Sequence, residues 1–250
     1  TYFARDYTVP SVGQAAFLLF DLTGLLSVFL SILGLVFLVR KSSNSLTRLL
    51  GGAAFAGFGV LAYLRYGGYA ATNPFQPQMF QHFNPFFIVV LTPIVIGVFG
   101  WLNRKGKEPS APRKIGIGML ITAAAYTILV IGSLSLASPK ALGGLVAPAE
   151  SQVSVYWLIA TYFGLTIAEL FLSPIGISFV SKVAPPKYKG LMQGGWFAAT
   201  AVGNSLVGVV AWFWMRVPLW AVWAILVGAC LLSAAFIFAI MRRLERAAAA

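Results

Sequence analysis

Seven long apolar stretches, separated by short loops, restrict this chain to very few architectures. The stretches cover residues 12–39, 46–66, 79–102, 115–136, 153–180, 190–213 and 219–241. Each has roughly the 20 apolar residues that an α-helix needs to cross a bilayer. Only 10% of all residues are charged, whereas a soluble domain has about 25%. The sequence therefore predicts an all-α polytopic membrane protein.

The basic residues are unevenly divided among the loops. Most of the 18 Lys and Arg residues lie in every second loop, near Arg40, Arg104, Lys187 and Arg242. Because Lys and Arg are enriched on the cytoplasmic side of membranes, we expect these loops and the C-terminus to be cytoplasmic. The protein is expected to be a multi-pass protein of the cell inner (plasma) membrane. Topology thus accounts for the positive net charge, and nucleic acid is not an expected partner.

The sequence offers little material for metal or cofactor chemistry. Cys230 is the only cysteine and His82 the only histidine. One copy of the chain therefore cannot form a cysteine metal site, a disulfide or a bis-histidine haem site. The sequence also contains no phosphate-binding loop and no catalytic triad. We accordingly expect no enzyme activity, no cofactor and no metal.

One carboxylate lies deep within an apolar stretch. Glu169 is the only acidic residue of the segment YFGLTIAELFLSPIGISFVSK, residues 162–182. A carboxylate in the middle of a membrane helix costs about 2.5–3.5 kcal/mol and usually has a function. Ser173 follows four residues later and therefore lies on the same helix face. Glu169 is either a site that titrates or binds a cation, and so exchanges a proton for a substrate amine, or a structural carboxylate capped by a hydroxyl.

Other polar or aromatic residues of these stretches allow two readings each. Asn84, before Pro85, offers a hydrogen-bond donor and acceptor to a ligand, or it is a helix N-cap. Trp196, flanked by glycines, is either a pocket wall or an ordinary interface aromatic. Lys182 is typical of a lysine that reaches toward the membrane surface rather than of a gate. For Asp21, the second acidic residue within a stretch, the sequence suggests no role.

Three segments carry a resemblance to a known family. AELFLSPIGISFVSKVAP, followed by KGLMQGGWFAATAVGNSLVG, resembles the C-terminal signature of the proton-dependent oligopeptide transporters (POT/PTR) of the major facilitator superfamily. NPFFIVVLTPIVIGVFGWLNRKGKEPSAPRKIGIGM is similar to the upstream helix pair of that family. The resemblance covers about residues 79–213. It implies a C-terminal six-helix bundle whose first helix is mostly missing from this chain.

The resemblance also implies functional residues. Asn84, Glu169, Ser173 and Trp196 match family positions at the substrate site. Asn84 and Glu169 would hold the amino terminus of a peptide, and Glu169 would also couple transport to protons. The function implied is that of the C-terminal part of a proton-coupled di-/tripeptide symporter, which binds peptide near the bilayer midplane by alternating access. The alternative is a transporter-derived structural subunit of a larger membrane complex, without transport activity.

The same reading divides the chain into four parts. Residues 1–8 are expected to end a transmembrane helix, and residues 9–78 to form an inserted pair of transmembrane helices. Residues 79–246 would form five spans of the transporter bundle, and residues 247–250 a tail. Both ends are expected to be limits of a longer chain. The expected partners are a di- or tripeptide, a proton, the lipid bilayer and a missing N-terminal bundle in the same or another chain.

Overall fold

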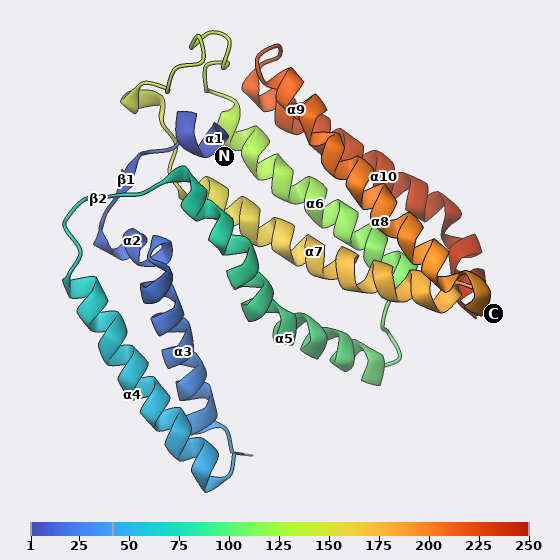
Figure 1. The fold of residues 1–250 in the computed structure, drawn as a ribbon, viewed down its shortest axis with the longest axis horizontal. Helices are drawn as coiled ribbons and strands as arrows, with labels where there is room; N and C mark the ends of the chain where they lie inside the picture. Colours follow the sequence, from blue (N-terminus) through green and yellow to red (C-terminus); the bar gives the residue numbers. More distant parts are fainter. Residues whose placement is uncertain (1, 42, 250) are drawn as a thin grey trace. The chain divides into compact units, whose positions relative to one another are not determined.

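The computed structural model describes residues 2–41 and 43–249, which are mainly helical (Figure 1). Seven of the described helical segments are long and apolar enough to cross a membrane. They are Leu22–Val39, Ser45–Gly67, Pro77–Arg104, Ala111–Ser133, Tyr156–Val183, Pro186–Trp214 and Leu219–Ala247. The prediction of an all-α polytopic membrane protein is confirmed. The sequence did not predict the short antiparallel pair formed by β1 (Ser11–Val12) and β2 (Asn73–Pro74).

The chain forms two compact units. One contains Val9–His82 with the residues up to Arg5, and the other contains Asp6–Thr8 with the residues from Phe83 onward. The helices of the first unit are α1 (Tyr2–Asp6, which ends at the boundary), α2 (Gln14–Phe20), α3 (Leu22–Val39), α4 (Ser45–Gly67) and η1 (Pro77–His82). The helices of the second are α5 (Phe83–Arg104), α6 (Ala111–Ser133), η2 (Ala149–Ser151), α7 (Tyr156–Val183), η3 (Pro186–Tyr188), α8 (Lys189–Ser205), α9 (Val207–Trp214) and α10 (Leu219–Ala249).

In the first unit, α3 and α4 form a hairpin whose backbones nearly touch. A Cβ atom added to Gly34 would lie 2.6 Å from the backbone nitrogen of Phe55 and 2.7 Å from the carbonyl oxygen of Gly51. The Ser31 hydroxyl donates a hydrogen bond of 3.0 Å to the carbonyl of Phe55 across the same contact. Small residues allow such close helix approach inside a membrane. The two helices therefore pack against each other through glycine and serine.

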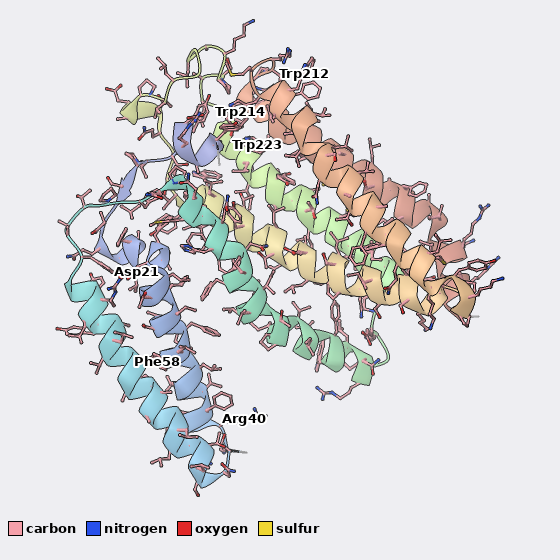
Figure 2. The ribbon with its side chains drawn as sticks, viewed as in Figure 1. Asp21, Arg40, Phe58, Trp212, Trp214 and Trp223 are labelled. Atoms are coloured by element: carbon pink, nitrogen blue, oxygen red, sulfur yellow. The ribbon has the colours of Figure 1, made fainter. Side chains whose placement is uncertain are left out.

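Asp21 closes one end of this hairpin (Figure 2). The apolar stretch expected over residues 12–39 is interrupted there, because Asp21 ends α2 and caps α3 by accepting a hydrogen bond from the Thr23 amide. Its other oxygen accepts hydrogen bonds from Arg65, at 2.9 and 2.7 Å, and from the Tyr69 hydroxyl, at 2.6 Å. Burial alone would raise the pKa of Asp21. The hydrogen bonds from Tyr69 and Arg65 outweigh this effect, so the pKa lies below its ordinary value of 3.8. The structure thus gives Asp21 a structural role that the sequence did not suggest.

In the second unit, α6 lies between α7 and α10 (Figure 1). Glycines again mark the contacts. A Cβ atom on Gly118 would lie 2.9 Å from the Leu172 side chain of α7, and one on Gly116 would lie 2.9 Å from the Phe238 ring of α10. The α6 helix is therefore the centre of this unit, and α7 is fixed against it along its length.

One end of the second unit is closed by residues 6–8. The buried Tyr7 donates a hydrogen bond from its hydroxyl to the carbonyl of Ala137, at 2.9 Å. The backbone of Asp6 and Tyr7 accepts hydrogen bonds from the amides of Ala147 and Val153 in the loop between α6 and α7. Trp214 and Trp223 lie at this same end, with ring centroids 6.0 Å apart (Figure 2).

The stretch expected over residues 190–213 is also interrupted. The structure divides it at Leu206 into α8 and α9. The α8 helix contacts α7, and it carries Trp196, one of the predicted site residues.

Candidate functional site

The candidate site lies where α5 and α7 meet. Asn84 is the second residue of α5, and Glu169 lies in the middle of α7. The Asn84 side-chain nitrogen Nδ2 donates a hydrogen bond of 2.7 Å to Oε2 of Glu169. Both side chains are half-buried. The fold therefore joins two residues that are 85 positions apart and that the resemblance implied to act together.

The reading of Asn84 as an N-cap is wrong. A cap residue precedes the helix and accepts a hydrogen bond from one of its first amides. Here α5 already begins at Phe83, and the Asn84 side chain donates across to α7. The side chain of Asn84 is thus committed to the contact between the two helices.

Thr166 is a member of the site that the sequence analysis missed. It lies three residues before Glu169, is completely buried, and its Oγ1 is 3.3 Å from Nδ2 of Asn84. The same hydroxyl donates a hydrogen bond of 2.8 Å to the carbonyl of Tyr162. Its position one turn from Glu169 was a usable signal, since residues i and i+3 share a helix face. Threonine is common in apolar helices, so the sequence alone does not distinguish this residue.

Ser173 and Trp196 take different positions relative to Glu169. Ser173 is exposed, and its hydroxyl makes no hydrogen bond with Glu169 within the described chain. Trp196 packs on Gly176, where an added Cβ would lie only 2.2 Å from Cη2 of the indole ring. Glu169, Ser173 and Gly176 follow each other at spacings of four and three, and therefore lie along one face of α7. The face that carries the carboxylate thus continues to the Trp196 ring.

Comparison with known families identifies the chain. A sequence model described as the POT family matches residues 71–221, which is more than half of the chain. The chain belongs to the POT family. The matched region contains Asn84, Thr166, Glu169, Ser173 and Trp196.

Curated relatives agree with this assignment. The chain is 35% identical over 137 residues to dipeptide and tripeptide permease A of Salmonella typhimurium, which covers 55% of this chain and 25% of that protein. It is 34% identical over 143 residues to the Escherichia coli permease of the same name, covering 57% and 26%. The aligned region thus spans about a quarter of the length of these relatives.

Solved structures show the same fold. A crystal structure of a peptide transporter POT in complex with sulfate matches 91% of this chain and 47% of that one, with a TM-score of 0.59 and 23% identity. A POT family transporter in complex with 5-aminolevulinic acid matches 90% and 48%, with a TM-score of 0.58 and 23% identity. The major facilitator fold expected from the resemblance is confirmed.

Glu169 differs from the ion-paired carboxylates of the described chain, because no cation lies beside it. Within the described residues, no Lys, Arg or His nitrogen forms an ion pair with Glu169, whereas Asp21, Glu108 and Glu245 each have a partner. Lys182, on the same helix, makes no ion pair in this part of the chain either. The Glu169 carboxylate is therefore held by a neutral amide alone.

The other end of the unit holds a separate polar network. Glu108, in the loop between α5 and α6, pairs with Lys114 and accepts a hydrogen bond of 2.6 Å from Asn103. The hydrogen bonds from Lys114 and Asn103 lower the pKa of Glu108. Glu245 of α10 accepts from Ser110 at 2.7 Å and pairs with Arg113 at 2.8 Å. These contacts fasten the α5–α6 loop and the end of α10 to the start of α6.

A cavity of about 470 Å³ lies beside this network, between α5, α6 and α7. Its lining residues include Thr92, Phe99, Glu108, Lys114 and Leu170. Asn84, Thr166 and Glu169 do not line it.

The described residues contain no group of three or more His, Cys, Asp or Glu side chains placed to hold a metal ion. Cys230 is a free, half-buried thiol on α10. The chemistry that the site itself offers is hydrogen bonding to an amide and a carboxylate, and a carboxylate can also accept a proton.

Proposed function

We propose that this chain is the C-terminal part of a proton-coupled symporter for di- and tripeptides. Membership in the POT family and the permeases among its relatives support transport rather than a purely structural subunit. The observation that carries the proposal is the 2.7 Å contact between Asn84 and Glu169, made without a competing cation. A second bundle, in the same or another chain, would complete the alternating-access machine, with peptide bound near the midplane.

The amino terminus of a peptide fits the chemistry of this contact. An ammonium group donates hydrogen bonds and carries a positive charge, and a carboxylate oxygen and an amide oxygen both accept. Oδ1 of Asn84 and Oε1 of Glu169 accept no hydrogen bond from the described residues, and neither atom is buried. Both atoms are thus open to a ligand. Ser173 and Trp196 would line the pocket farther along the same face of α7.

Glu169 would also carry the proton. A carboxylate without a cationic partner inside a membrane protein is costly when ionised, and such residues commonly serve as proton carriers. In the proposed cycle, Glu169 gives up its proton when the ammonium binds. For symport that proton must stay with the transporter, on an acceptor in the second bundle, until proton and peptide leave on the same side. The single residue would thus link proton transfer to binding of the substrate amine.

Replacing Glu169 by Gln in the complete protein tests this function. Glutamine preserves the shape and an acceptor oxygen but cannot titrate. We expect proton-driven dipeptide accumulation in liposomes to be lost. Affinity should fall roughly 10- to 150-fold, as for a charge-assisted hydrogen bond of about 1.5–3 kcal/mol. Ser173→Ala should be milder. Normal uptake by a folded Glu169→Gln protein would refute the assignment.

The proposal includes a place and an orientation in the cell. The protein would lie in the inner (plasma) membrane with its C-terminus in the cytoplasm, as the distribution of basic loops favours. Cysteines placed at Lys107 and Lys140 in a Cys230→Ser background should then react with an impermeant thiol reagent from opposite sides. Reaction from the same side would contradict this orientation.

Residues 9–78 would form an inserted helix pair that contributes no residue to the substrate site. The support lies in the side chains of the pair, since Asp21, the acidic residue inside it, is already engaged by Arg65 and Tyr69. The five spans of residues 79–246 would then hold all the residues of the C-terminal bundle that touch the peptide.

A further inference from the structure

The completely buried Thr166 makes two hydrogen bonds with its single hydroxyl. Oγ1 is 2.8 Å from the carbonyl oxygen of Tyr162 and 3.3 Å from Nδ2 of Asn84. A backbone carbonyl can only accept, so the one hydroxyl hydrogen must point to Tyr162. Oγ1 is then left as an acceptor toward Asn84. Any group that Asn84 presents to Thr166 must therefore be a donor.

This polarity decides which way the Asn84 amide is turned. An asparagine side chain has a donor end and an acceptor end of nearly identical shape. Thr166 requires the donor end, Nδ2, at its side. The same Nδ2 has a second hydrogen, which reaches Oε2 of Glu169 at 2.7 Å. Oδ1 consequently faces away from both residues and remains an acceptor.

Glu169 on its own cannot hold this orientation in both of its protonation states. When ionised it only accepts, and it selects Nδ2. When protonated it can also donate, and a free amide would then turn to offer Oδ1. Thr166 removes that choice, because its oxygen accepts in either state of Glu169.

The helices packed against α7 add no other carboxylate or cation at the level of Glu169. The other titratable side chains in the middle of these helices and of α7 are phenols and a thiol, namely Tyr126, Tyr162 and Cys230. The charged side chains of α5, α6, α8 and α10 lie near the helix ends: Arg104, Arg113, Lys114, Lys189, Arg242, Arg243, Glu245 and Arg246. The contact with Thr166 is thus what fixes the orientation of the Asn84 amide when Glu169 changes its protonation state.

We propose that Thr166 is a positioning residue for peptide binding. It holds Oδ1 of Asn84 toward the substrate ammonium whether Glu169 is ionised or protonated. This inference rests on the proposed peptide-binding function and extends it to a residue that acts through Asn84. Without Thr166, only ionised Glu169 holds the amide. A protonated Glu169 then lets the amide turn its N–H groups toward the arriving ammonium, which they repel.

The test measures binding of alanyl-alanine to the complete protein and to four variants. Thr166→Val keeps the shape and removes the hydroxyl, and we expect it to weaken binding roughly five- to tenfold, as for one lost hydrogen bond. Thr166→Ser keeps the hydroxyl and should bind within about twofold of the wild type. Asn84→Ala should be weak, and adding Thr166→Val to it should produce no further loss.

The double variant separates positioning from a general structural role. If Thr166 only supports packing, the two losses multiply, and the proposal is overturned. It is also overturned if Thr166→Val binds as well as wild type, or if Thr166→Ser is as weak as Thr166→Val. Should Thr166→Val fail to fold, the smaller Thr166→Ala takes its place in the same cycle. A wild-type protein that binds no alanyl-alanine would overturn the proposed function, and this role with it.

Discussion

Asp21 and Glu169, each the single acid of an apolar stretch, are in opposite situations. Asp21, in the α3–α4 hairpin, accepts hydrogen bonds from Arg65, Tyr69 and the Thr23 amide, so that its charge is balanced and both its oxygens are used. Glu169, between α5 and α7, accepts from Asn84 and is balanced by no cation in the described chain. Both residues are single acids in apolar stretches of the sequence. The difference teaches that the partners of a carboxylate separate a structural role from an available site.

The surrounding packing follows the same division. The hairpin is closed by direct backbone contact at Gly34 and Gly51. The α5–α7 contact is polar and partly open, and the adjacent face of α7 continues past Ser173 to Trp196. A tightly packed contact whose polar groups are all hydrogen-bonded is typical of a structural role. A partly open contact with free hydrogen-bond acceptors is typical of a ligand site.

The largest effect is expected from overfilling the hairpin. In Gly34→Leu the new side chain meets backbone atoms at 2.6 and 2.7 Å, which cannot move without separating α3 from α4. We expect a loss of stability of about 3 kcal/mol, at the upper end of what overpacking costs. Thermal unfolding measures it, with Gly57→Leu as the control, because nothing lies within 4 Å of an added Cβ there. Equal melting of the two variants would contradict a closed hairpin.

An intermediate effect is expected on the open side of the comparison. Gly176→Ala places a methyl group 2.2 Å from the Trp196 ring and must displace the ring from α7. Dipeptide affinity should fall roughly tenfold, as for the cost of a displaced, well-packed side chain. Gly97→Ala in α5 is the matched control, since an added Cβ there meets nothing within 4 Å. Unchanged dipeptide affinity in Gly176→Ala would show that Trp196 does not line the pocket.

The smallest effect is expected at Asp21. Asp21→Asn should lower stability by only about 1 kcal/mol, because the Arg65 side chain is 46% exposed and solvent screens the pair. The folded pKa of Asp21 lies below 3.8, so this stabilisation is present above pH 3.8 and is lost as the pH falls through the folded pKa. Melting curves at neutral and acidic pH measure it. Proton-driven uptake by Asp21→Asn should remain normal. Loss of uptake would contradict the purely structural role of Asp21.

Much of the fold followed from local pattern. Apolar length fixes a membrane helix because lipid offers the backbone no hydrogen-bond partner, so the seven spans were predictable one by one. Asp21 and Leu206, where two stretches divide into separate helices, were not predicted. A break at Asp21 depends on Arg65 and Tyr69, which lie 44 and 48 residues away.

The sequence by itself determined that the chain crosses the membrane repeatedly, and its motifs placed it in the POT family. It also selected Asn84 and Glu169 as candidates, because isolated polar groups in lipid are costly and seldom accidental. Only the tertiary structure decided that these two side chains meet, that Thr166 lies beside the Asn84 amide, and that Asp21 is fully paired. Those facts depend on hydrogen bonds between helices distant in sequence, and the direction of such bonds is set by the packing of the folded chain.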